Sequence, residues 1–499
     1  MTYHLTHLIN GQPHTGSSSR SNDLFNPATG ELIGHVPLAE VSDVNLAVAA
    51  AKAALPAWSN TPVIKRVRIL AFFKHLIEEN ISELASIITR EHGKTLDDAK
   101  GSILRGIEVL EFILAAPYLL EGRFSDQVSN GIDCYSIRQA VGVCVGITPF
   151  NFPAMIPLWM FPVSIACGNT FVLKPSERDP SCAQHLVKMA HEAGIPDGVI
   201  NLIHGDKVAV DALLAHPDVA AVSFVGSTPI AEYVHHTASL HRKRVQAFGG
   251  AKNHAVIMPD ADIKQAADAI AGAAFGSCGQ RCMAISVAVV VGDKLAEKLL
   301  PHLIGHANSL RIGKGDQPNI DMGPLVSAAQ REKVLAFVES GVNEGATLVV
   351  DGREYKHPDY PHGYYLGAHI FDHVHPEMLI YQEEIFGPVL CIVRVSSEDE
   401  ALKLINAHPY ANGTAIFTRD GDSAREFSRR VEVGMVGINV AIPVPVAQHS
   451  FGGWKRSRFS DLGMFGQDSI LFNTKLKTIT TRWPGGLREQ SAYVMPSHE

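Results

Sequence analysis

Apolar positions follow two patterns that divide this 499-residue chain. Between Val41 and Glu121 they recur at helical spacing, as in SDVNLAVAAAKAAL, which opens with a Ser/Asp cap, and ISELASIITREHG, which ends at a glycine. From about residue 141, short β-rich runs alternate with helical stretches; the runs are VGVCVGITP, NTFVLKPSE, GVINLIHG and AAVSFVGST. Because parallel strands need crossover helices, this rhythm predicts a doubly wound parallel sheet.

A second α/β series starts at NHAVIMPDADIKQAADAIAGAAF and continues through ISVAVVVGD, PVLCIVRV, GTAIFTR and GMVGINV. Two such units predict two domains with a cleft between them. At the N-terminus, HLINGQ predicts a hairpin that turns at Asn10-Gly11, within a short antiparallel start. The tail SILFNTKLKTITTRW alternates like an antiparallel strand, and such a leftover strand often pairs with another subunit.

Composition narrows the class of protein. Hydrophobic residues make up 46% and charged residues 19% of the chain, which is typical of a globular enzyme. The formal charge of −8 argues against nucleic acid or an anionic membrane as the main partner. The seven scattered cysteines and the absence of a secretory pattern favour the cytoplasm. The most apolar stretch, AMIPLWMFPVSIACG, is shorter than the roughly 20 residues of a membrane helix, so we expect it in the interior.

Two segments are candidates for a phosphate-bearing cofactor, although the GxGxxG fingerprint is missing. SFVGSTPIAEYV places Gly226 and Ser227 between a strand and a helix, where backbone N–H groups bind anions; an ordinary capped turn has the same pattern. LKPSERDP places Lys174 and Glu177 directly after an apolar strand, where a carboxylate can hold both hydroxyls of an adenosine ribose and favour NAD over NADP. Taken alone, that segment fits a solvated loop better.

The segment FGSCGQRCMAIS carries two cysteines four positions apart. This spacing is poor for zinc without a second pair, and CxxC redox spacing is absent, so we expect no metal. Cys282 lies in a polar turn beside Arg281, which would favour a thiolate, whereas Cys278 has no flanking charge. These residues alone leave a nucleophile and a buried inert thiol both open.

Five motifs in order carry a resemblance across nearly the whole chain: TPFNFP (148–153), LKPSE (173–177), FVGST (224–228), GQRC (279–282) and EEIFGPV (383–389). Together they resemble the aldehyde dehydrogenase superfamily. The resemblance implies a thiolate that attacks an aldehyde, hydride transfer to NAD and a thioester acyl-enzyme. It also implies an α/β fold with two doubly wound Rossmann-like domains and a small β oligomerisation arm.

The resemblance assigns roles to individual residues. Cys282 would be the nucleophile, and the Asn151 amide would form an oxyanion hole with the backbone N–H of Cys282. The remaining assignments concern the cofactor: Thr148 and Phe150 would line it, Lys174, Glu177 and Arg178 would meet its adenosine ribose, Gly226 and Ser227 its pyrophosphate, and Glu384 with Phe386 its nicotinamide ribose. Gly249 is also assigned to the cofactor site.

The resemblance also divides the chain into parts. The NAD-binding domain would comprise residues 1–121 and 141–250, the catalytic domain 251–447 and the oligomerisation arm 122–140 and 474–499. Residues 448–473 would be a return segment that packs at the domain cleft. The family suggests a homotetramer, a dimer of dimers, although the sequence does not decide between dimer and tetramer.

One departure from the family pattern concerns release of the acyl group. Hydrolytic members carry a glutamate just before a Gly-Gly, where it activates water. In VQAFGGAKNHAV that position is Ala247, and neither Gln246 nor Phe248 can replace it. A missing general base costs about 10²–10⁴ in rate. A thiol acceptor needs no strong base, so coenzyme A is the predicted co-substrate.

Two arginines indicate an acidic substrate. Arg281 adjoins the nucleophile and Arg105 lies in the apolar helix GSILRGIEVLEF; guanidinium groups suit a carboxylate, although a structural ion pair is the alternative for Arg105. The segments GQRCMA, GAKNH and INVAIPVPV resemble the CoA-acylating methylmalonate-semialdehyde dehydrogenases, whereas FGGWKRS differs in detail.

The prediction is therefore NAD-dependent oxidation of malonate or methylmalonate semialdehyde, with loss of CO₂, to acetyl-CoA or propionyl-CoA. A hydrolytic aldehyde dehydrogenase that releases a free acid is the alternative. A non-catalytic protein that kept the fold is a third hypothesis, which the Asn151, Cys282 and Glu384 set opposes. The preferred semialdehyde, and the pathway of valine, inositol or β-alanine breakdown, stay open at this point.

Overall fold

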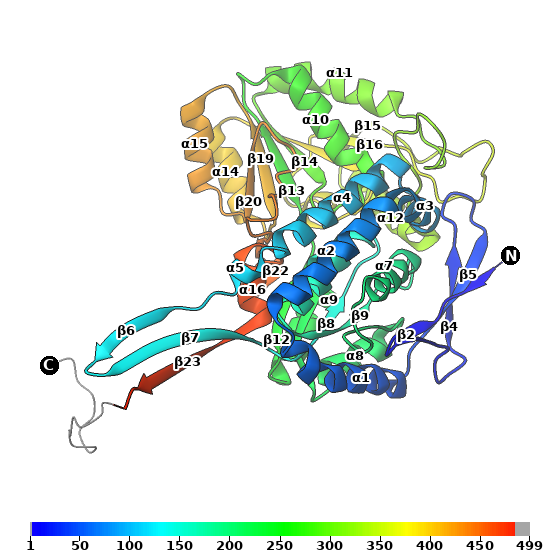
Figure 1. The fold of residues 1–499 in the computed structure, drawn as a ribbon. Helices are drawn as coiled ribbons and strands as arrows, with labels where there is room; N and C mark the ends of the chain where they lie inside the picture. The colour runs from blue at the N-terminus through cyan, green and yellow to red at the C-terminus, as the bar shows by residue number, and fades with distance from the viewer. Residues whose placement is uncertain (1, 485–499) are drawn as a thin grey trace.

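The computed structural model describes residues 2–484. Its first half is built on an eight-stranded sheet in the order β22-β12-β11-β8-β9-β10-β2-β3 (Figure 1). The five central strands are parallel, as the alternation of apolar strands and helices predicts. Their bounds are Arg244–Phe248 (β12), Val219–Val225 (β11), Val143–Ile147 (β8), Thr170–Lys174 (β9) and Ile200–Leu202 (β10).

The edge strands of this sheet are antiparallel, whereas the N-terminal part of the chain also contains one parallel pair, formed by its first strand. β2 (His7–Ile9) and β3 (Gln12–His14) form the predicted hairpin, with Asn10 and Gly11 at φ 52° and 73° in its turn. β4 (Ser21–Phe25) pairs with β5 (Leu32–Pro37), which also pairs with β1 (Tyr3–His4). On the other edge, β22 (Arg458–Phe459) pairs with β12.

Helices cover both faces of this sheet because side chains alternate along each strand. Val143 and Val145 of β8 pack in the cluster that includes the buried faces of α1, α8 and α9, whereas Cys144 packs in the cluster formed by α2–α4, α6 and α7. The helices are α1 (Val41–Ser59), α2 (Val63–Glu79), α3 (Ile81–His92), α4 (Leu96–Ile113), α5 (Ala116–Leu119), α6 (Met155–Ala166), α7 (Ser181–Glu192), α8 (Lys207–Ala215) and α9 (Thr228–Leu240).

The second half contains a seven-stranded sheet in the order β15-β16-β17-β14-β13-β19-β20, parallel except for β15. Its strands are Thr347–Val350 (β15), His369–Asp372 (β16), Val389–Val395 (β17), Ile285–Val291 (β14), Asn253–Ile257 (β13), Gly413–Phe417 (β19) and Met435–Ile438 (β20). The associated helices are α10 (Ile263–Phe275), α11 (Asp293–Ser309), α12 (Ala328–Asn343), α13 (Leu379–Gln382), α14 (Glu398–Ala407) and α15 (Gly421–Arg430). Short strands β18 (Tyr410–Ala411) and β21 (Trp454–Lys455) pair nearby.

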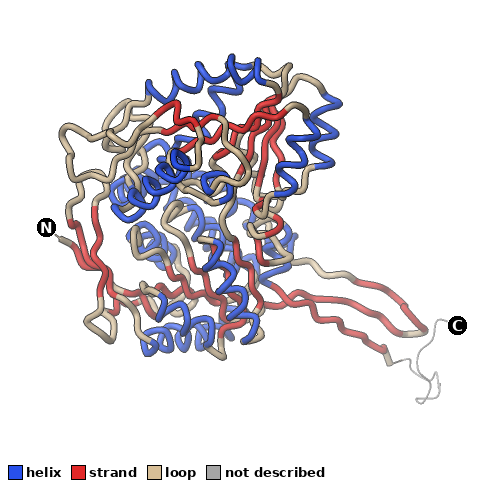
Figure 2. The backbone as a smooth tube through the Cα atoms, turned by 180° about the vertical axis from the view of Figure 1, so that it is seen from behind, coloured by secondary structure: helices blue, strands red, loops and turns tan. Residues whose placement is uncertain are grey.

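A three-stranded arm projects from the body, opposite the N-terminus (Figures 1 and 2). It consists of β6 (Phe124–Ser129), β7 (Ile132–Ala140) and β23 (Thr474–Arg482), in the order β23-β7-β6. The predicted tail strand is correct from Thr474 onward, whereas residues 469–473 belong to α16 (Gln467–Asn473). β23 pairs with β7 of its own chain, and its other edge has no partner within residues 2–484. The predicted arm residues 485–499 lie outside the described residues.

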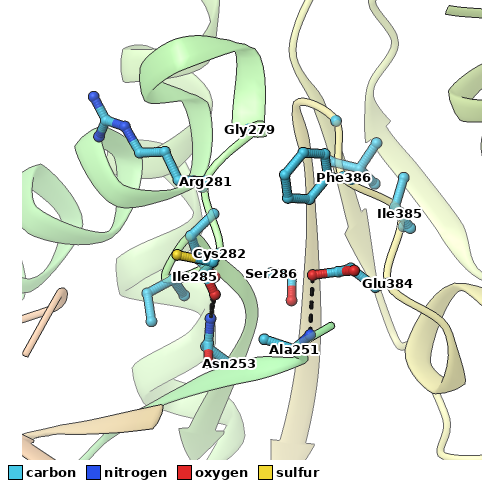
Figure 3. Close-up of a pocket in the computed structure, with 14 residues that line it drawn as sticks. Ala251, Asn253, Gly279, Arg281, Cys282, Ile285, Ser286, Glu384, Ile385 and Phe386 are labelled. Atoms are coloured by element: carbon cyan, nitrogen blue, oxygen red, sulfur yellow. Dashed lines mark hydrogen bonds between the residues drawn. The ribbon is translucent and has the colours of Figure 1, made fainter. Parts of the chain in front are cut away.

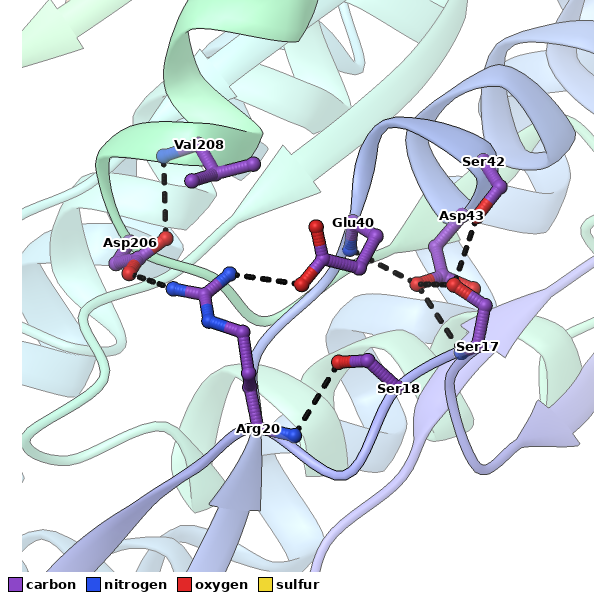
Figure 4. A network of polar contacts seen from close by, with 8 residues as sticks. All are labelled: Ser17, Ser18, Arg20, Glu40, Ser42, Asp43, Asp206 and Val208. Atoms are coloured by element: carbon purple, nitrogen blue, oxygen red, sulfur yellow. Dashed lines mark hydrogen bonds and ion pairs between the residues drawn. The ribbon is translucent and has the colours of Figure 1, made fainter.

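The predicted cap of α1 is wrong in detail. Glu40 is the N-cap residue, and Ser42 and Asp43 lie in the first turn, where the Asp43 carboxylate accepts a hydrogen bond from the Glu40 N–H at 2.9 Å. Asp43 also accepts from Ser17 (Figure 4). Arg20 donates to both Glu40 and Asp206, and so ties this helix start to the start of α8.

Two other predictions about segments are confirmed. α3 ends at Gly93, whose φ of 92° is the left-handed conformation that glycine adopts most easily. The apolar stretch around residues 154–168 forms α6, every residue of which is buried. Within residues 2–484, no helix has the length and apolarity needed to span a membrane. All seven cysteines are free thiols.

Candidate active site

The turn between α10 and β14 separates the two cysteines of FGSCGQRC. Ser277 and Cys278 both have left-handed backbones, at φ 52° and 53°, and this tight turn directs Cys278 into the core, where it is fully buried. Cys282 lies beyond the turn, is half-buried and lines the cavity drawn in Figure 3. Of the two thiols, therefore, only that of Cys282 faces a cavity.

A cleft of about 690 Å³ collects most of the predicted site residues. They come largely from the carboxyl ends of β8, β9, β11 and β12, the edge at which parallel sheets bind ligands. The predicted residues that line it are Thr148, Phe150, Asn151, Lys174, Glu177, Arg178, Gly226, Ser227, Gly249, Cys282, Glu384 and Phe386. Arg105 and Arg281 are not among the lining residues.

The cleft has the features that a dinucleotide requires. The Thr148 hydroxyl is buried and has no hydrogen-bond partner among the described residues, although it lines the cleft. The Glu384 carboxylate packs so closely against Gly250, at the wall of the cleft, that a Cβ atom there would lie only 2.5 Å from it. Ser227 is the N-cap residue of α9 and lines the cleft, so the positive end of this helix lies at the cleft. An NAD molecule fits this set of groups.

At the far end of the cleft, Glu177 is held as a carboxylate. Burial would raise its pKa, but the Lys174 ammonium, with Nζ 3.2 Å from Oε2, and the nearby Arg178 bring the pKa below its ordinary value. The Arg178 guanidinium lies 5.3 Å from the centre of the Phe150 ring. This end can therefore accept hydrogen bonds from ribose hydroxyls and carries cations for a phosphate.

Glu384 lies close to Cys282 at the other end. Burial raises the pKa of Glu384 to about 7, and its carboxylate accepts a hydrogen bond from the Ala251 N–H at 2.9 Å (Figure 3). Lys252, also buried, donates to the carbonyls of Ile380 and Glu383 at 2.6 and 2.8 Å. Ala251 and Lys252 thus hold the side chain of Glu384 and the turn that precedes it. Sequence reasoning quoted GAKNH but missed this function of Lys252.

A buried ion cluster links Arg281 to Asn151. The Asp98 carboxylate accepts from Arg281 Nη2 at 2.6 Å, and its other oxygen lies 3.8 Å from Lys94 Nζ. Lys94, which is buried, donates to the Asn151 carbonyl at 2.7 Å. Although burial opposes it, these two cations lower the pKa of Asp98 to about 2. Sequence reasoning missed Lys94 and Asp98, because no motif spacing connects EHGKTLDD with either partner.

Arg105 lies two helical turns after Asp98 on α4, away from the residues that line the cleft. Its Nη2 donates to the carbonyls of Val444 and Pro445, and its Nη1 lies 2.7 Å from the Glu108 carboxylate. The structural ion pair that was the alternative for this residue is therefore present. Arg105 holds the loop INVAIPVPV against α4.

No acidic side chain occupies the end of β12. Ala247 is fully buried and pairs with Phe459, Gln246 donates to Ser223, and Phe248 packs against Phe451. The carboxyl groups that line the cleft are those of Glu177, Asp206 and Glu384. The position expected for a water-activating glutamate is thus apolar.

Comparison with known proteins agrees with this geometry. The model of the aldehyde dehydrogenase family matches residues 14–479. The chain is 56% identical over 494 residues to a malonate-semialdehyde dehydrogenase of Pseudomonas aeruginosa, covering 99% of both chains. It is 46% identical over 492 residues to the human mitochondrial methylmalonate-semialdehyde/malonate-semialdehyde dehydrogenase (acylating), covering 98% of this chain and 92% of the relative.

Solved structures agree as well. A putative methylmalonate-semialdehyde dehydrogenase from Sinorhizobium meliloti, in complex with NAD, matches with a TM-score of 0.97 and 54% identity, covering 98% of this chain and 100% of that one. A methylmalonate-semialdehyde dehydrogenase from Oceanimonas doudoroffii matches with a TM-score of 0.96 and 53% identity, covering 97% of this chain and 99% of that one. The predicted fold class is confirmed, and the chain belongs to the aldehyde dehydrogenase family.

Proposed function

We propose that this enzyme oxidises malonate or methylmalonate semialdehyde with NAD and transfers the decarboxylated acyl group to CoA. One observation carries the proposal: Cys282 shares a dinucleotide-sized cleft with Asn151, while the end of β12, where a hydrolytic enzyme needs a base, is apolar. The names of the Pseudomonas aeruginosa and human relatives support the same substrate class, and the human name includes acylation.

The first step is attack of the Cys282 sulfur on the aldehyde carbon, which forms a C–S bond and an oxyanion. In the present structure the Asn151 amide donates to the Gln280 carbonyl at 3.1 Å, so it lies at the nucleophile's turn and can exchange this bond for one to the oxyanion. The backbone N–H of Cys282 is the second donor. NAD, when bound, accepts the hydride that leaves this carbon. The product on the protein is a thioester at Cys282.

The substrate carboxylate lies β to the thioester carbonyl. When its C–C bond breaks, CO₂ leaves and the electron pair passes to that carbonyl, and a proton then completes an acetyl or propionyl thioester. A CoA thiolate attacks the same carbonyl and releases the Cys282 thiolate. We propose that Arg281 and Arg105 orient the substrate carboxylate. Arg281 must then exchange its ion pair with Asp98 for the substrate, and Arg105 must exchange its hydrogen bonds to the carbonyls of Val444 and Pro445.

NADH formation with malonate semialdehyde, methylmalonate semialdehyde and propanal, each with and without CoA, tests the proposal. We expect acyl-CoA as the product of both semialdehydes, and turnover at least about tenfold slower without CoA, because no general base assists water. Free acid at equal rates with and without CoA would support the hydrolytic alternative. Propanal, which lacks the carboxylate, should have kcat/KM lower by about 10- to 100-fold, the value of one charge-assisted hydrogen bond. Equal values for propanal would remove the role of the arginines.

The domain division and assembly are further parts of the proposal. Residues 1–121 and 141–250 would bind NAD, residues 251–447 would carry catalysis, and residues 448–473 would return to the cleft, which the pairing of β22 with β12 supports. The edge of β23 that has no partner within residues 2–484 supports an oligomerisation arm. The proposed assembly is a homotetramer, and the proposed location is the cytoplasm. Sedimentation equilibrium should give the mass of four chains, and a monomer would contradict this part.

A further inference from the structure

The backbone carbonyl of Cys282, the proposed nucleophile, accepts hydrogen bonds from two buried side-chain amides that belong to other parts of the chain. Asn253, at the start of β13, donates from Nδ2 to the Cys282 carbonyl at 2.9 Å (Figure 3). Asn412, just before β19, donates to the same carbonyl at 3.2 Å. Both side chains are almost fully buried, with exposed fractions of 2% and 6%. A carbonyl with two amide donors is strongly restrained in direction.

Asn253 is itself fixed by further hydrogen bonds. Its Nδ2 also donates to the Ala284 carbonyl at 3.0 Å, and its Oδ1 accepts from the Gly413 N–H at 3.1 Å. Asn412 Nδ2 lies 2.9 Å from the sulfur of Met283. The two amides therefore bracket residues 282–284 from the parallel strands β13 and β19, which are neighbours in the second sheet.

The restraint reaches the thiol through the peptide group that joins Cys282 to Met283. In a planar trans peptide the C=O and the N–H point in opposite directions. Amides that hold the Cys282 oxygen on one side consequently direct the Met283 N–H to the other side. Burial and Glu384 raise the pKa of the Cys282 thiol to about 12, and the backbone N–H groups of Cys282 and Met283 act in the opposite direction.

We propose that Asn253 and Asn412 are positioning residues for the nucleophile: they orient the 282–283 peptide so that the Met283 N–H stabilises the thiolate of Cys282. This inference rests on the nucleophilic role of Cys282 in the proposed function. Neither amide touches the reacting atoms; both act through the backbone.

Other charged groups around the sulfur act independently of this pair. Glu384, from the loop before β17, raises the pKa of the thiol, and Lys94, from the loop before α4, lowers it. Arg281 and Asp98 form an ion pair next to Lys94. Substitution of Asn253 or Asn412 by alanine leaves all of these charges in place. Alanine is the preferred substitution, because the carboxylate of an Asn253→Asp variant would act on the sulfur directly.

The test is the pH dependence of alkylation of Cys282 by iodoacetamide in the full-length protein without NAD or substrate. Tryptic cleavage after Arg281 places Cys282 and Cys278 in different peptides, so mass spectrometry follows each thiol separately. Loss of one hydrogen bond to a thiolate lowers the fraction of the thiol that is ionised by about 10-fold or more. The thiolate that does form is more basic and therefore more nucleophilic, which cancels about half of the logarithm of that loss. We expect Asn253→Ala to react about three- to tenfold more slowly than wild type.

Asn412→Ala should react about two- to threefold more slowly, because its hydrogen bond to the carbonyl is the longer one. If Asn253→Ala does not fold, the alkylation rate of Asn412→Ala still tests the inference. The matched control is Asn169→Ala: Asn169 is equally buried, donates to two carbonyls and accepts one backbone N–H, but lies at the base of the arm. It should lose thermal stability while Cys282 reacts at the wild-type rate.

Wild-type alkylation rates in folded Asn253→Ala and Asn412→Ala, at every pH, would overturn the inference. An equal slowing in Asn169→Ala would overturn it as well, because the effect would then be a general loss of packing. The assay uses no aldehyde, NAD or CoA. Its outcome is therefore separate from that of the substrate comparison, and a wrong substrate class would leave the alkylation result unchanged.

Discussion

Substitution of Cys282 by alanine is expected to abolish NADH formation, with a loss of at least about 10⁴-fold in kcat for any aldehyde, because no thioester can form without the sulfur. Absorbance of NADH in a stopped-flow and a steady-state assay measures both the first turnover and later ones. The loss must already be present in the first turnover, since attack on the aldehyde precedes every other step.

Cys278→Ala is the matched control for this variant. Cys278 is fully buried in the core of the second sheet, four positions away in the same turn, and faces neither the cleft nor the smaller pocket. Its loss should reduce thermal stability by about 1 kcal/mol and leave kcat within about twofold of wild type. Persistent NADH formation by Cys282→Ala, or its loss in Cys278→Ala with an intact fold, would show that the nucleophile is wrongly assigned.

Asn151→Ala should lower kcat by about 10²–10³-fold, the cost of removing one oxyanion-hole donor, with little change in the KM for NAD. The side chain can be removed without loss of its turn, because Lys94 holds the Asn151 backbone carbonyl and not the amide. Steady-state kinetics that separate kcat from KM measure the effect.

The alkylation rate of Cys282 is the control for Asn151→Ala, and it should stay close to the wild-type value. A higher KM with an unchanged kcat in Asn151→Ala would contradict the role of Asn151 as an oxyanion donor, because such a donor acts in the transition state and not on the bound aldehyde. A slowed alkylation rate would indicate instead that Asn151 supports the thiol or its turn.

Most of the architecture follows from local patterns in the sequence. Alternation of short apolar strands and helices determines the parallel sheets, because each pattern matches the period of one element and parallel strands need crossovers. Single residues determine local features too, such as Asn10-Gly11 in the first hairpin and Gly93 at the end of α3. The cap of α1 was misplaced because Ser42 and Asp43 suit either the cap or the first turn.

The candidate site consists of residues that local motifs identify and of supporting residues that they do not. The residues of the cleft belong to short contiguous motifs at strand ends, so sequence alone identifies them, and Ala247 is visible as a departure for the same reason. The supports of the site are different: Lys94, Asp98, Lys252 and Asn412 contact it across long sequence separations.

The sequence by itself thus determined the fold class and predicted the nucleophile's turn and the acceptor chemistry, because each depends on residues that are neighbours in the chain. Only the tertiary structure decided the present partners of the two arginines, Asp98 for Arg281 and the carbonyls of residues 444 and 445 for Arg105. It also decided which amides hold the Cys282 peptide. The physical reason is that ion pairs and hydrogen bonds in a core depend on distance and direction in space, which residue spacing does not encode.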